Sequence, residues 1–263
     1  MRLSPPNRSS ADDSHSNLER SRDQLLQIEK LASVGKLAAG MAHEILNPLT
    51  AIKMWLFSIR NAVGLDEELD RKFAIVSEEM GRLEALVRNF LEFCRPPSPT
   101  IRPQRAFAVM EKTGELVRHP IRNKRIRFQC EEPPAMPPVL CDPQQLEQVL
   151  LNLLVNAVEA TPEGGVIRLW SALERGMGDC PSVVIRVEDT GPGIAELAQA
   201  RIFEPFYTTK ENGTGLGLYI AAQIMAQLGG GLALERSGPG GSCFAVWAPA
   251  AVEEGDEQNP GRG

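Results

Sequence analysis

Residues 142–165 read DPQQLEQVLLNLLVNAVEATPEGG, and they carry the clearest helix signals in the chain. Asp142 suits the N-cap, Pro143 suits the first helical position, and Gln145 completes a capping box. The proline and glycines that follow residue 161 end the helix. We therefore expect a helix from residue 142 to about residue 161, with strongly apolar side chains at most of its positions.

The segments on either side of this helix alternate between helical and extended patterns. Apolar runs bounded by turn residues predict strands at 126–130, 166–171, 183–188, 232–236 and 243–247. Helices are expected at 107–117 and 218–228, and a glycine-rich stretch spans 191–217. Strands and helices mixed in this way predict an α+β sandwich, with one sheet under one helical layer.

The first third of the chain has a helical pattern instead. Apolar residues recur every three or four positions over residues 17–60, with a kink expected at Pro48, and again over residues 67–93. Residues 64–66 predict the turn between these two helices. A helical hairpin with one apolar stripe per helix has too little partner surface by itself, so we expect two hairpins to pair as a dimeric four-helix bundle.

Proline spacing predicts the boundary between the two domains. Three prolines within residues 96–99 end the second helix and form a stiff connector. The expected order is therefore a disordered tail, the helical hairpin, a Pro-rich linker, the α+β domain and a polar tail: 1–16, 17–95, 96–106, 107–250 and 251–263.

Composition excludes several classes of protein. The 263 residues have a formal net charge of −6 and a hydrophobic fraction of 43%, which argues against a nucleic-acid partner and for an ordinary globular chain. No apolar run approaches the roughly 18 residues of a membrane span, and the N-terminus lacks a secretory signal. The five cysteines are scattered, so we expect reduced thiols and a cytoplasmic protein.

The first group of candidate functional residues lies at 41–49, which read MAHEILNPL. His43 falls between two positions of the apolar stripe, so helical geometry points its ring toward solvent, where a neutral imidazole can act as a nucleophile. Glu44 can accept a proton or orient the ring, and Asn47 lies one turn on, on the same face. An ordinary surface His–Glu pair is the alternative interpretation.

A second group is the pair Asn152 and Asn156, four residues apart on the apolar helix. Amides on a buried helix need partners, and a phosphate-bound Mg²⁺ would supply them, because this ion takes oxygen ligands. Capping or loop-bonding asparagines are the alternative interpretation.

A third group follows an apolar strand, where residues 189–194 read DTGPGI. Two close glycines let the backbone and the Asp189 carboxylate approach a planar ligand, and the carboxylate can accept a hydrogen bond from an exocyclic amine such as that of adenine. A plain turn at the end of a strand explains the same residues.

The fourth group combines FEPFYTTK at 203–210 with GTGLGL at 213–218. Alternate glycines that open a helix suit phosphate binding at its N-terminus, and the long preceding segment suits a nucleotide lid. The spacing matches neither the dinucleotide-binding glycine motif nor a P-loop. A mobile loop without a ligand is the alternative.

In this order and spacing, the four groups resemble the catalytic core of bacterial two-component sensor histidine kinases, over about residues 25–250. The hairpin is similar to their dimerisation and phosphoacceptor domain. Residues from about 100 to 250 are similar to their ATP-binding domain, of the type shared with gyrase and heat-shock chaperones. The H-E-x-x-N-P form at 43–48 is most similar to the nitrogen-regulation branch.

The resemblance implies a role for individual residues. His43 matches the phosphoacceptor, Glu44 matches the acid that assists proton removal, and Asn47 matches the position that orients water when phosphate is removed from the partner. Asn152 and Asn156 match the Mg²⁺-binding helix. The implied ATP-binding set is Asn152, Asn156, Asp189, Gly191, Gly193, Ile194, Phe203, Thr208, Thr209, Lys210, Gly213, Thr214, Gly215, Leu216, Gly217 and Leu218.

The resemblance also implies an activity and partners. An ATP- and Mg²⁺-dependent protein-histidine kinase would phosphorylate His43 and pass the phosphoryl group to an aspartate in the receiver domain of a response regulator, as a homodimer. Phosphatase activity toward that regulator is left open. No sensor domain is visible, so we expect either a separate sensor protein or a core that belongs to a longer chain.

One departure and two alternatives accompany this interpretation. Many family members carry Lys or Arg where this chain has Glu159, so Lys210 is the candidate replacement for a phosphate contact. An ATPase clamp would share the ATP site and hydrolyse to water, with Glu159 as a conceivable general base. A dimeric scaffold that binds ATP without turnover is the third reading.

Overall fold

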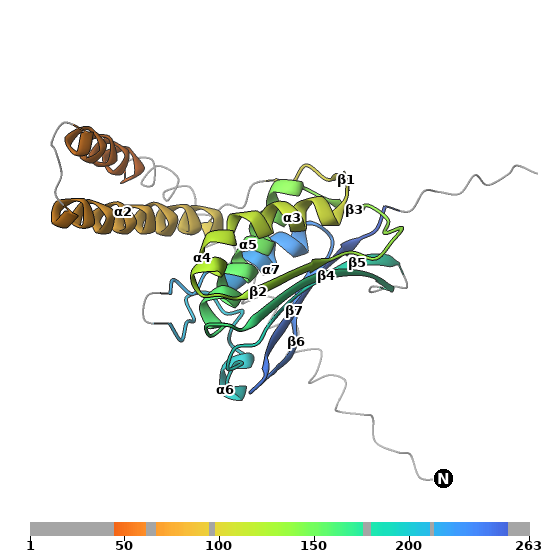
Figure 1. Cartoon of the computed structure of the whole chain (residues 1–263). Helices are drawn as coiled ribbons and strands as arrows, with labels where there is room; N and C mark the ends of the chain where they lie inside the picture. Colours follow the sequence, from red (N-terminus) through yellow and green to blue (C-terminus); the bar gives the residue numbers. More distant parts are fainter. Residues whose placement is uncertain (1–44, 62–66, 95–97, 176–179, 211–212, 252–263) are drawn as a thin grey trace, which may run out of the picture. The chain divides into compact units, whose positions relative to one another are not determined.

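The computed structural model describes residues 45–61, 67–94, 98–175, 180–210 and 213–251, and it divides the chain into two compact units, Met1–Pro96 and Pro97–Gly263. The described part of the first unit is helical, and the second unit combines helices with a sheet (Figure 1). This confirms the expected fold class.

The first unit contains a helix over residues 45–61 and a long helix, α2 (Glu67–Cys94). Ion pairs join the two helices, from Lys53 to Glu84 at 3.1 Å and from Arg60 to Asp70 at 2.8 Å. The expected helices are therefore present over the described residues, and they form a hairpin.

Much of the apolar stripe on this hairpin is accessible in the single chain. Ile52 and Ile59 are 49% and 46% exposed, whereas Met80 is buried. Contiguous apolar surface of this kind marks an interaction site. Among the described residues, no helix is both long enough and apolar enough to cross a bilayer.

The second unit is built on a five-stranded sheet in the order β2-β4-β5-β7-β6. β2 and β4 pair in parallel, and the remaining neighbours pair antiparallel. The strands are β2 (Arg127–Glu131), β4 (Val166–Arg175), β5 (Pro181–Asp189), β6 (Gly231–Gly238) and β7 (Gly241–Pro249). All five contain strands expected from the sequence, and β4 extends beyond the expected residue 171 to Arg175.

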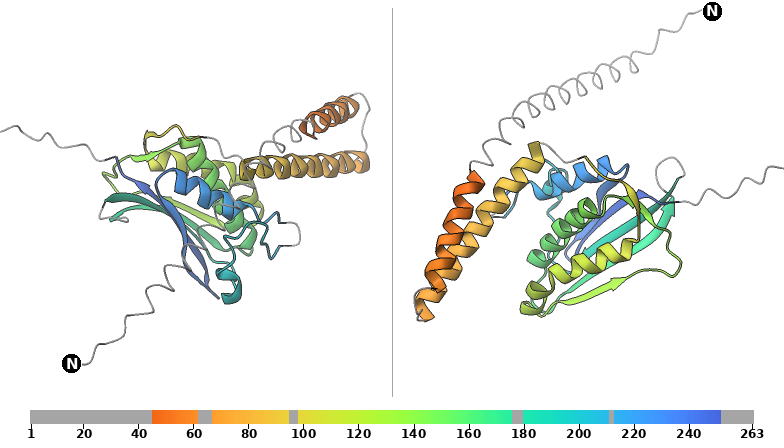
Figure 2. Two further views of the ribbon diagram at one scale, coloured as in Figure 1. Left: turned by 180° about the vertical axis from the view of Figure 1, so that it is seen from behind. Right: turned by 90° about the horizontal axis from the view of Figure 1, so that it is seen from above.

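Three helices cover one face of this sheet (Figures 1 and 2): α3 (Ala106–Leu116), α5 (Pro143–Ala160) and α7 (Gly217–Gln227). The core lies between this layer and the sheet, where alternate strand residues point inward. Its fully buried members include Leu150, Leu154, Ile167, Leu169 and Ile185.

The N-terminus of α5 is capped as the sequence predicts. Asp142 Oδ1 accepts hydrogen bonds from the backbone N–H groups of Gln144 at 2.9 Å and Gln145 at 3.3 Å. Its Oδ2 accepts a third from Thr100 N–H at 2.8 Å. Burial raises the pKa of Asp142, but these three donors, with help from Arg102, outweigh it and lower the pKa overall.

The C-terminus of α5 is held by a residue distant in sequence. Lys124 Nζ donates to the carbonyl oxygens of Val158 at 2.8 Å, Glu159 at 3.0 Å and Thr161 at 3.3 Å. The last carbonyl groups of a helix lack intrahelical partners and carry partial negative charge, so an ammonium stabilises them. Both ends of α5 are therefore fixed by side chains.

Four short elements were not expected from the sequence: β1 (Arg102–Gln104), β3 (Val139–Cys141), α4 (Arg118–Asn123) and α6 (Glu196–Gln199). β1 lies within the expected linker and pairs antiparallel with β3. His119 belongs to α4, where its Nδ1 lies 3.2 Å from Asn123 Nδ2. Elements this short depend on tertiary contacts, so local sequence patterns do not reveal them.

Candidate functional site

Helix α5 organises the candidate site along one of its faces. Asn152, Asn156 and Ala160 are successive members of an i, i+4 series, so they lie on successive turns about 6 Å apart. Each of the three meets a different glycine-containing segment of the chain. One face of α5 therefore brings together three segments that are distant from one another in the sequence.

The first turn contacts the start of α7. Asn152 Nδ2 donates to the carbonyl oxygen of Gly217 at 3.2 Å. A Cβ built on Gly217 would lie 3.8 Å from Asn152 Cγ, which is ordinary van der Waals contact. The N-terminus of α7, where the first N–H groups of a helix have no intrahelical partner, therefore lies beside Asn152.

The second turn contacts the segment that was predicted to be a lid. Lys210 Nζ donates to Asn156 Oδ1 at 2.7 Å and forms an ion pair with the carboxylate of Glu159. All three side chains are partly accessible to solvent. The sequence motifs of α5 and of residues 203–210 are thus joined by direct contacts.

The third turn contacts the loop after β5. Gly191 N–H donates to Asp189 Oδ1 at 2.7 Å, and a Cβ on Gly191 would lie 2.8 Å from the carbonyl oxygen of Ala160. Burial raises the pKa of Asp189, and the nearby Glu188 adds to this, while the N–H groups of Gly191 and Ser242 act against it. A buried carboxylate is thus held beside the end of α5.

The loop that carries Asp189 is also fixed on its far side. Gly193 packs so closely on the backbone of Gly238 that a Cβ would lie 2.7 Å from the Gly238 carbonyl carbon. Ile194 N–H donates to Ser237 Oγ at 2.7 Å. The β6–β7 hairpin therefore positions this loop.

The segment 206–215 is closed at its base by two residues with left-handed backbone. Phe206 has a φ of +65° and Gly215 a φ of +66°, and Phe206 N–H donates to Gly215 O at 3.0 Å. Next to this base, the guanidinium of Arg201 stacks 4.3 Å above the ring of Tyr207. A strained bulky residue of this kind is typical of functional segments.

Local hydrogen bonds shape the rest of this segment. Lys210 N–H donates to Thr208 Oγ1 at 3.1 Å, and Gly213 N–H donates to Lys210 O at 3.2 Å. Leu216 N–H donates to Thr214 Oγ1 at 3.2 Å just before α7 begins. These bonds turn the chain back toward the α7 N-terminus.

Three further members of the predicted set lie beside these contacts. Phe203 packs edge-on against Phe244 of β7, with ring centroids 6.5 Å apart, so it anchors the segment to the sheet. Thr209 is exposed, and Leu218 lies in the first turn of α7.

The predicted phosphoacceptor group falls mostly outside the described residues. His43 and Glu44 lie outside them, whereas Asn47 is an exposed residue of the helix at 45–61. The roles assigned to these three residues stay predictions.

Lys124 is the residue that sequence reasoning missed. Its three carbonyl partners belong to the end of α5 that carries Asn156 and Glu159. They lie 34 to 37 positions along the chain, and no local motif marks such a contact.

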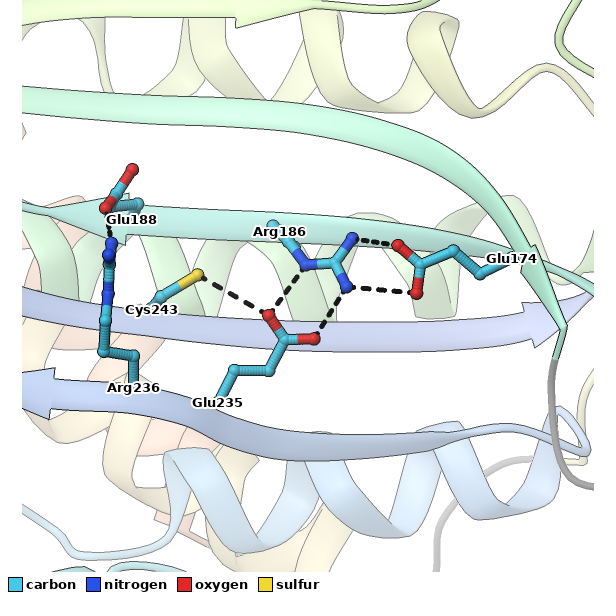
Figure 3. Close-up of polar contacts among 6 residues, drawn as sticks. All are labelled: Glu174, Arg186, Glu188, Glu235, Arg236 and Cys243. Carbon is cyan, nitrogen blue, oxygen red and sulfur yellow. Dashed lines mark hydrogen bonds and ion pairs between the residues drawn. The ribbon is translucent and has the colours of Figure 1, made fainter.

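A hollow of about 500 Å³ lies on the other face of the sheet, and Figure 3 shows four of its charged side chains, Arg186, Glu188, Glu235 and Arg236, together with the neighbouring Glu174. Arg186 donates to Glu174 at 2.6 and 3.1 Å and to Glu235 at 2.7 and 2.8 Å. These bonds raise the pKa of the guanidinium. Burial, with help from Glu235 and Glu188, raises the pKa of the Cys243 thiol to about 11, so it stays protonated at neutral pH.

The charges around this hollow compensate one another. Arg236 and Arg168 pair with Glu188, and Arg186 bridges two further glutamates. Three cations therefore face three anions, which leaves no net charge for an ionic ligand. We interpret the network as a set of cross-strand ion pairs that joins β4, β5 and β6 and is separate from the site on α5.

Comparison with known proteins gives the family. Residues 33–99 match the family described as His Kinase A (phospho-acceptor) domain. Residues 141–252 match the family described as Histidine kinase-, DNA gyrase B-, and HSP90-like ATPase. The solved catalytic domain of histidine kinase ThkA is 32% identical, with a TM-score of 0.51, and the match covers 95% of that chain and 57% of this one.

This chain belongs to the histidine kinase family. The resemblance stated from the sequence is therefore confirmed. Full-length ShkA in complex with AMPPNP is 30% identical at a TM-score of 0.72, over 83% of this histidine kinase and 46% of that chain. ThkA in complex with the response regulator protein TrrA is 30% identical at a TM-score of 0.59, over 90% of this chain and 66% of that one.

Curated relatives of this histidine kinase include a sporulation kinase and a sensor histidine kinase. Sporulation kinase E of Bacillus subtilis (strain 168) is 33% identical over 238 residues, which are 90% of this chain and 31% of the relative. Sensor histidine kinase ZraS of Escherichia coli (strain K12) is 34% identical over 237 residues, 90% of this chain and 50% of the relative. The chain thus spans a third to a half of these two relatives.

Proposed function

We propose that this histidine kinase transfers the γ-phosphoryl group of ATP to His43 and then to an aspartate of a response regulator. The observation that carries the proposal is the face of α5, on which Asn152, Asn156 and Ala160 meet three glycine-containing segments. A nucleotide laid along this face would meet an acceptor for its base and N–H donors for its phosphates.

Adenine recognition is assigned to Asp189. Its carboxylate is buried and fixed by backbone N–H groups, and a carboxylate oxygen can accept a hydrogen bond from the exocyclic amine of the base. Gly191 packs so closely on the end of α5 that a Cβ would collide with the Asp189 carboxylate and with the carbonyl oxygen of Ala160, and this close packing holds the carboxylate in place. Phosphates are assigned to the N-terminus of α7, which begins at Gly217.

The amide oxygens on α5 suit Mg²⁺ as ligands. Asn156 Oδ1 already accepts a hydrogen bond from a cation, the ammonium of Lys210, and Asn152 supplies a second amide one turn away. Amide oxygens and water are ligands that this ion prefers. When bound, Mg²⁺ would neutralise phosphate charge. Asn156 and Asn152 would hold it, and Lys210 would add a positive charge from the lid.

The chemical step needs a neutral imidazole and a proton acceptor. A ring nitrogen of His43 would attack the γ-phosphorus, so that an N–P bond forms while the bond to the ADP oxygen breaks. Glu44 would take the ring proton. An imidazole pKa near 6.5 leaves the ring unprotonated at neutral pH. Asn47 is assigned to orient water if the same helix also removes phosphate from the partner.

The assembly proposed is a homodimer. Its support is the apolar stripe of the hairpin, which a single chain leaves half exposed, together with the phospho-acceptor family match at 33–99. The complex of ThkA with TrrA supports a receiver-domain protein as the partner. We place the chain in the cytosol, because the four cysteines whose side chains the structure describes, at 130, 141, 180 and 243, are free thiols.

The competing reading as an ATPase clamp is less favoured. It has no use for a phospho-acceptor domain, whose family model matches residues 33–99, and it needs Glu159 as a general base for water, although this carboxylate is paired with Lys210 in the structure. A general base must reach the proton that it abstracts. Glu159 therefore suits the positioning of Lys210 better than the activation of water.

Labelling with [γ-³²P]ATP and Mg²⁺ tests the proposal. We expect a label on the protein that is lost in acid and kept in alkali, and no label on a His43→Gln variant. Release of inorganic phosphate without any label on the protein would instead support the ATPase clamp. Labelling of His43→Gln equal to that of the wild type would do the same.

A further inference from the structure

We propose that Lys210, Glu159 and Asn156 form a latch, in which the Lys210 ammonium takes the place of Mg²⁺ while the nucleotide is absent. The inference rests on the proposed function, because it concerns the same oxygen of Asn156. It assigns to Glu159 a positioning role: Glu159 sets how strongly Lys210 competes with the metal ion.

The geometry makes the two cations mutually exclusive. Lys210 Nζ lies 2.7 Å from Asn156 Oδ1, and it is ion-paired with Glu159 at the same time. An ammonium at hydrogen-bonding distance occupies the space that a metal ion would need to reach the same oxygen. Mg²⁺ must therefore displace Lys210 from Asn156 before it can bind there.

The solvent exposure of Lys210 and Glu159 indicates that their ion pair can break easily. The side chains of Lys210 and Glu159 are 43% and 53% exposed. Exposed ion pairs of this kind are weak, so the latch can open at little cost when phosphate offers Lys210 a better partner. A buried pair would instead resist opening.

The sequence of α5 explains why the latch exists in this chain. Glu159 lies three residues after Asn156, on an adjacent part of the same helix face. Lys or Arg at this position would repel Lys210, whereas a carboxylate attracts it. The negative charge thus keeps the lysine on α5 until nucleotide arrives.

The test measures ADP binding by calorimetry as a function of Mg²⁺ concentration, with EDTA as the zero point. The chains compared are the wild type, Glu159→Gln, Lys210→Gln and the double variant. Glu163→Gln is the matched control, because Glu163 is 64% exposed and forms an ion pair with Arg125 at 3.0 Å, outside the latch.

Removal of the competitor should make Mg²⁺ more effective. We expect the half-saturating Mg²⁺ concentration to fall in Lys210→Gln by up to about fivefold, the upper end of the range for an exposed pair. Glu159→Gln should show a smaller fall in the same direction, and the double variant should match Lys210→Gln. Glu163→Gln should behave as the wild type.

Two results would overturn the latch. One is an unchanged Mg²⁺ dependence in Lys210→Gln. The other is a Glu159→Gln effect of equal size with and without Lys210, which would mean that Glu159 acts by its charge on the nucleotide alone. Either result leaves wild-type ADP binding intact, whereas a wild-type protein that binds no ADP would contradict the proposed function itself.

Discussion

Gly215 offers a quantitative test of whether the closed base of segment 206–215 matters for nucleotide binding. Gly215 has a φ of +66°, and a Cβ there would lie 2.7 Å from Tyr207 N and Tyr207 O and would also collide with the carbonyl carbon of Phe206. Gly215→Ala therefore combines a left-handed backbone penalty of about 1–2 kcal/mol with a collision against backbone.

The collision can be relieved locally. Opening the Phe206–Gly215 hydrogen bond separates the two ends of the segment at a cost of about 1 kcal/mol, without disturbing the core. A site that must first close again then binds its ligand more weakly by the free energy needed to close it against the collision. With strain included, we expect nucleotide affinity to fall about tenfold or more, which is about 1.4 kcal/mol.

Gly164 provides the matched control. Its φ is +77°, but a Cβ there has no atom within 4 Å, so Gly164→Ala carries the backbone penalty without the collision. We expect Gly164→Ala to lose about 1–2 kcal/mol of unfolding free energy in urea, and Gly215→Ala to lose about 1 kcal/mol more. Calorimetry should then show weaker binding of a nonhydrolysable ATP analogue to Gly215→Ala alone. Wild-type nucleotide affinity in Gly215→Ala, or an equal loss of nucleotide affinity in Gly215→Ala and Gly164→Ala, would refute the reasoning.

Three further variants test the fold and the site. Asp142→Ala should lose about 1–2 kcal/mol of unfolding free energy at pH 7. Because the folded-state pKa of Asp142 is lowered, this difference should persist above pH 5 and shrink in urea titrations as the pH falls below about 4. Arg186→Leu leaves Glu174 and Glu235 facing each other, so thermal unfolding should show a loss of about 1–2 kcal/mol with nucleotide affinity unchanged. Asp189→Asn should weaken ADP binding about tenfold or more through the loss of a charged acceptor, and unchanged affinity would remove Asp189 from the base site.

Helix α5 could be predicted from the sequence because its signals are local. The cap, the proline and the apolar run all lie within the helix or next to it, and the observed bounds, Pro143–Ala160, fall within a residue or two of the expected ones. The strands of the sheet could be predicted for the same reason. By contrast, α4, β1 and β3 form through contacts with distant segments, so local sequence patterns did not predict them.

The candidate site divides in the same way. The residue types at Asn156, Asp189 and the glycines pointed to nucleotide chemistry because each group is short and contiguous. The contacts of Lys124 and Lys210 could not be predicted, since they join positions 34 to 54 residues apart. The pairing of Lys210 with Glu159 depends on the fold of the segment between them.

The central claim is that the nucleotide held on α5 phosphorylates His43, and peptide mapping tests it most directly. Trypsin should release residues 37–53, LAAGMAHEILNPLTAIK, in which His43 is the sole histidine. After incubation with Mg²⁺ and ATP, and digestion at alkaline pH, we expect this peptide to gain the mass of one phosphoryl group on the imidazole ring. At an ATP concentration below the wild-type Kd, the same gain should be about tenfold smaller in Asp189→Asn protein. Phosphate found on another peptide, or peptide 37–53 unmodified while ATP is consumed, would contradict the claim.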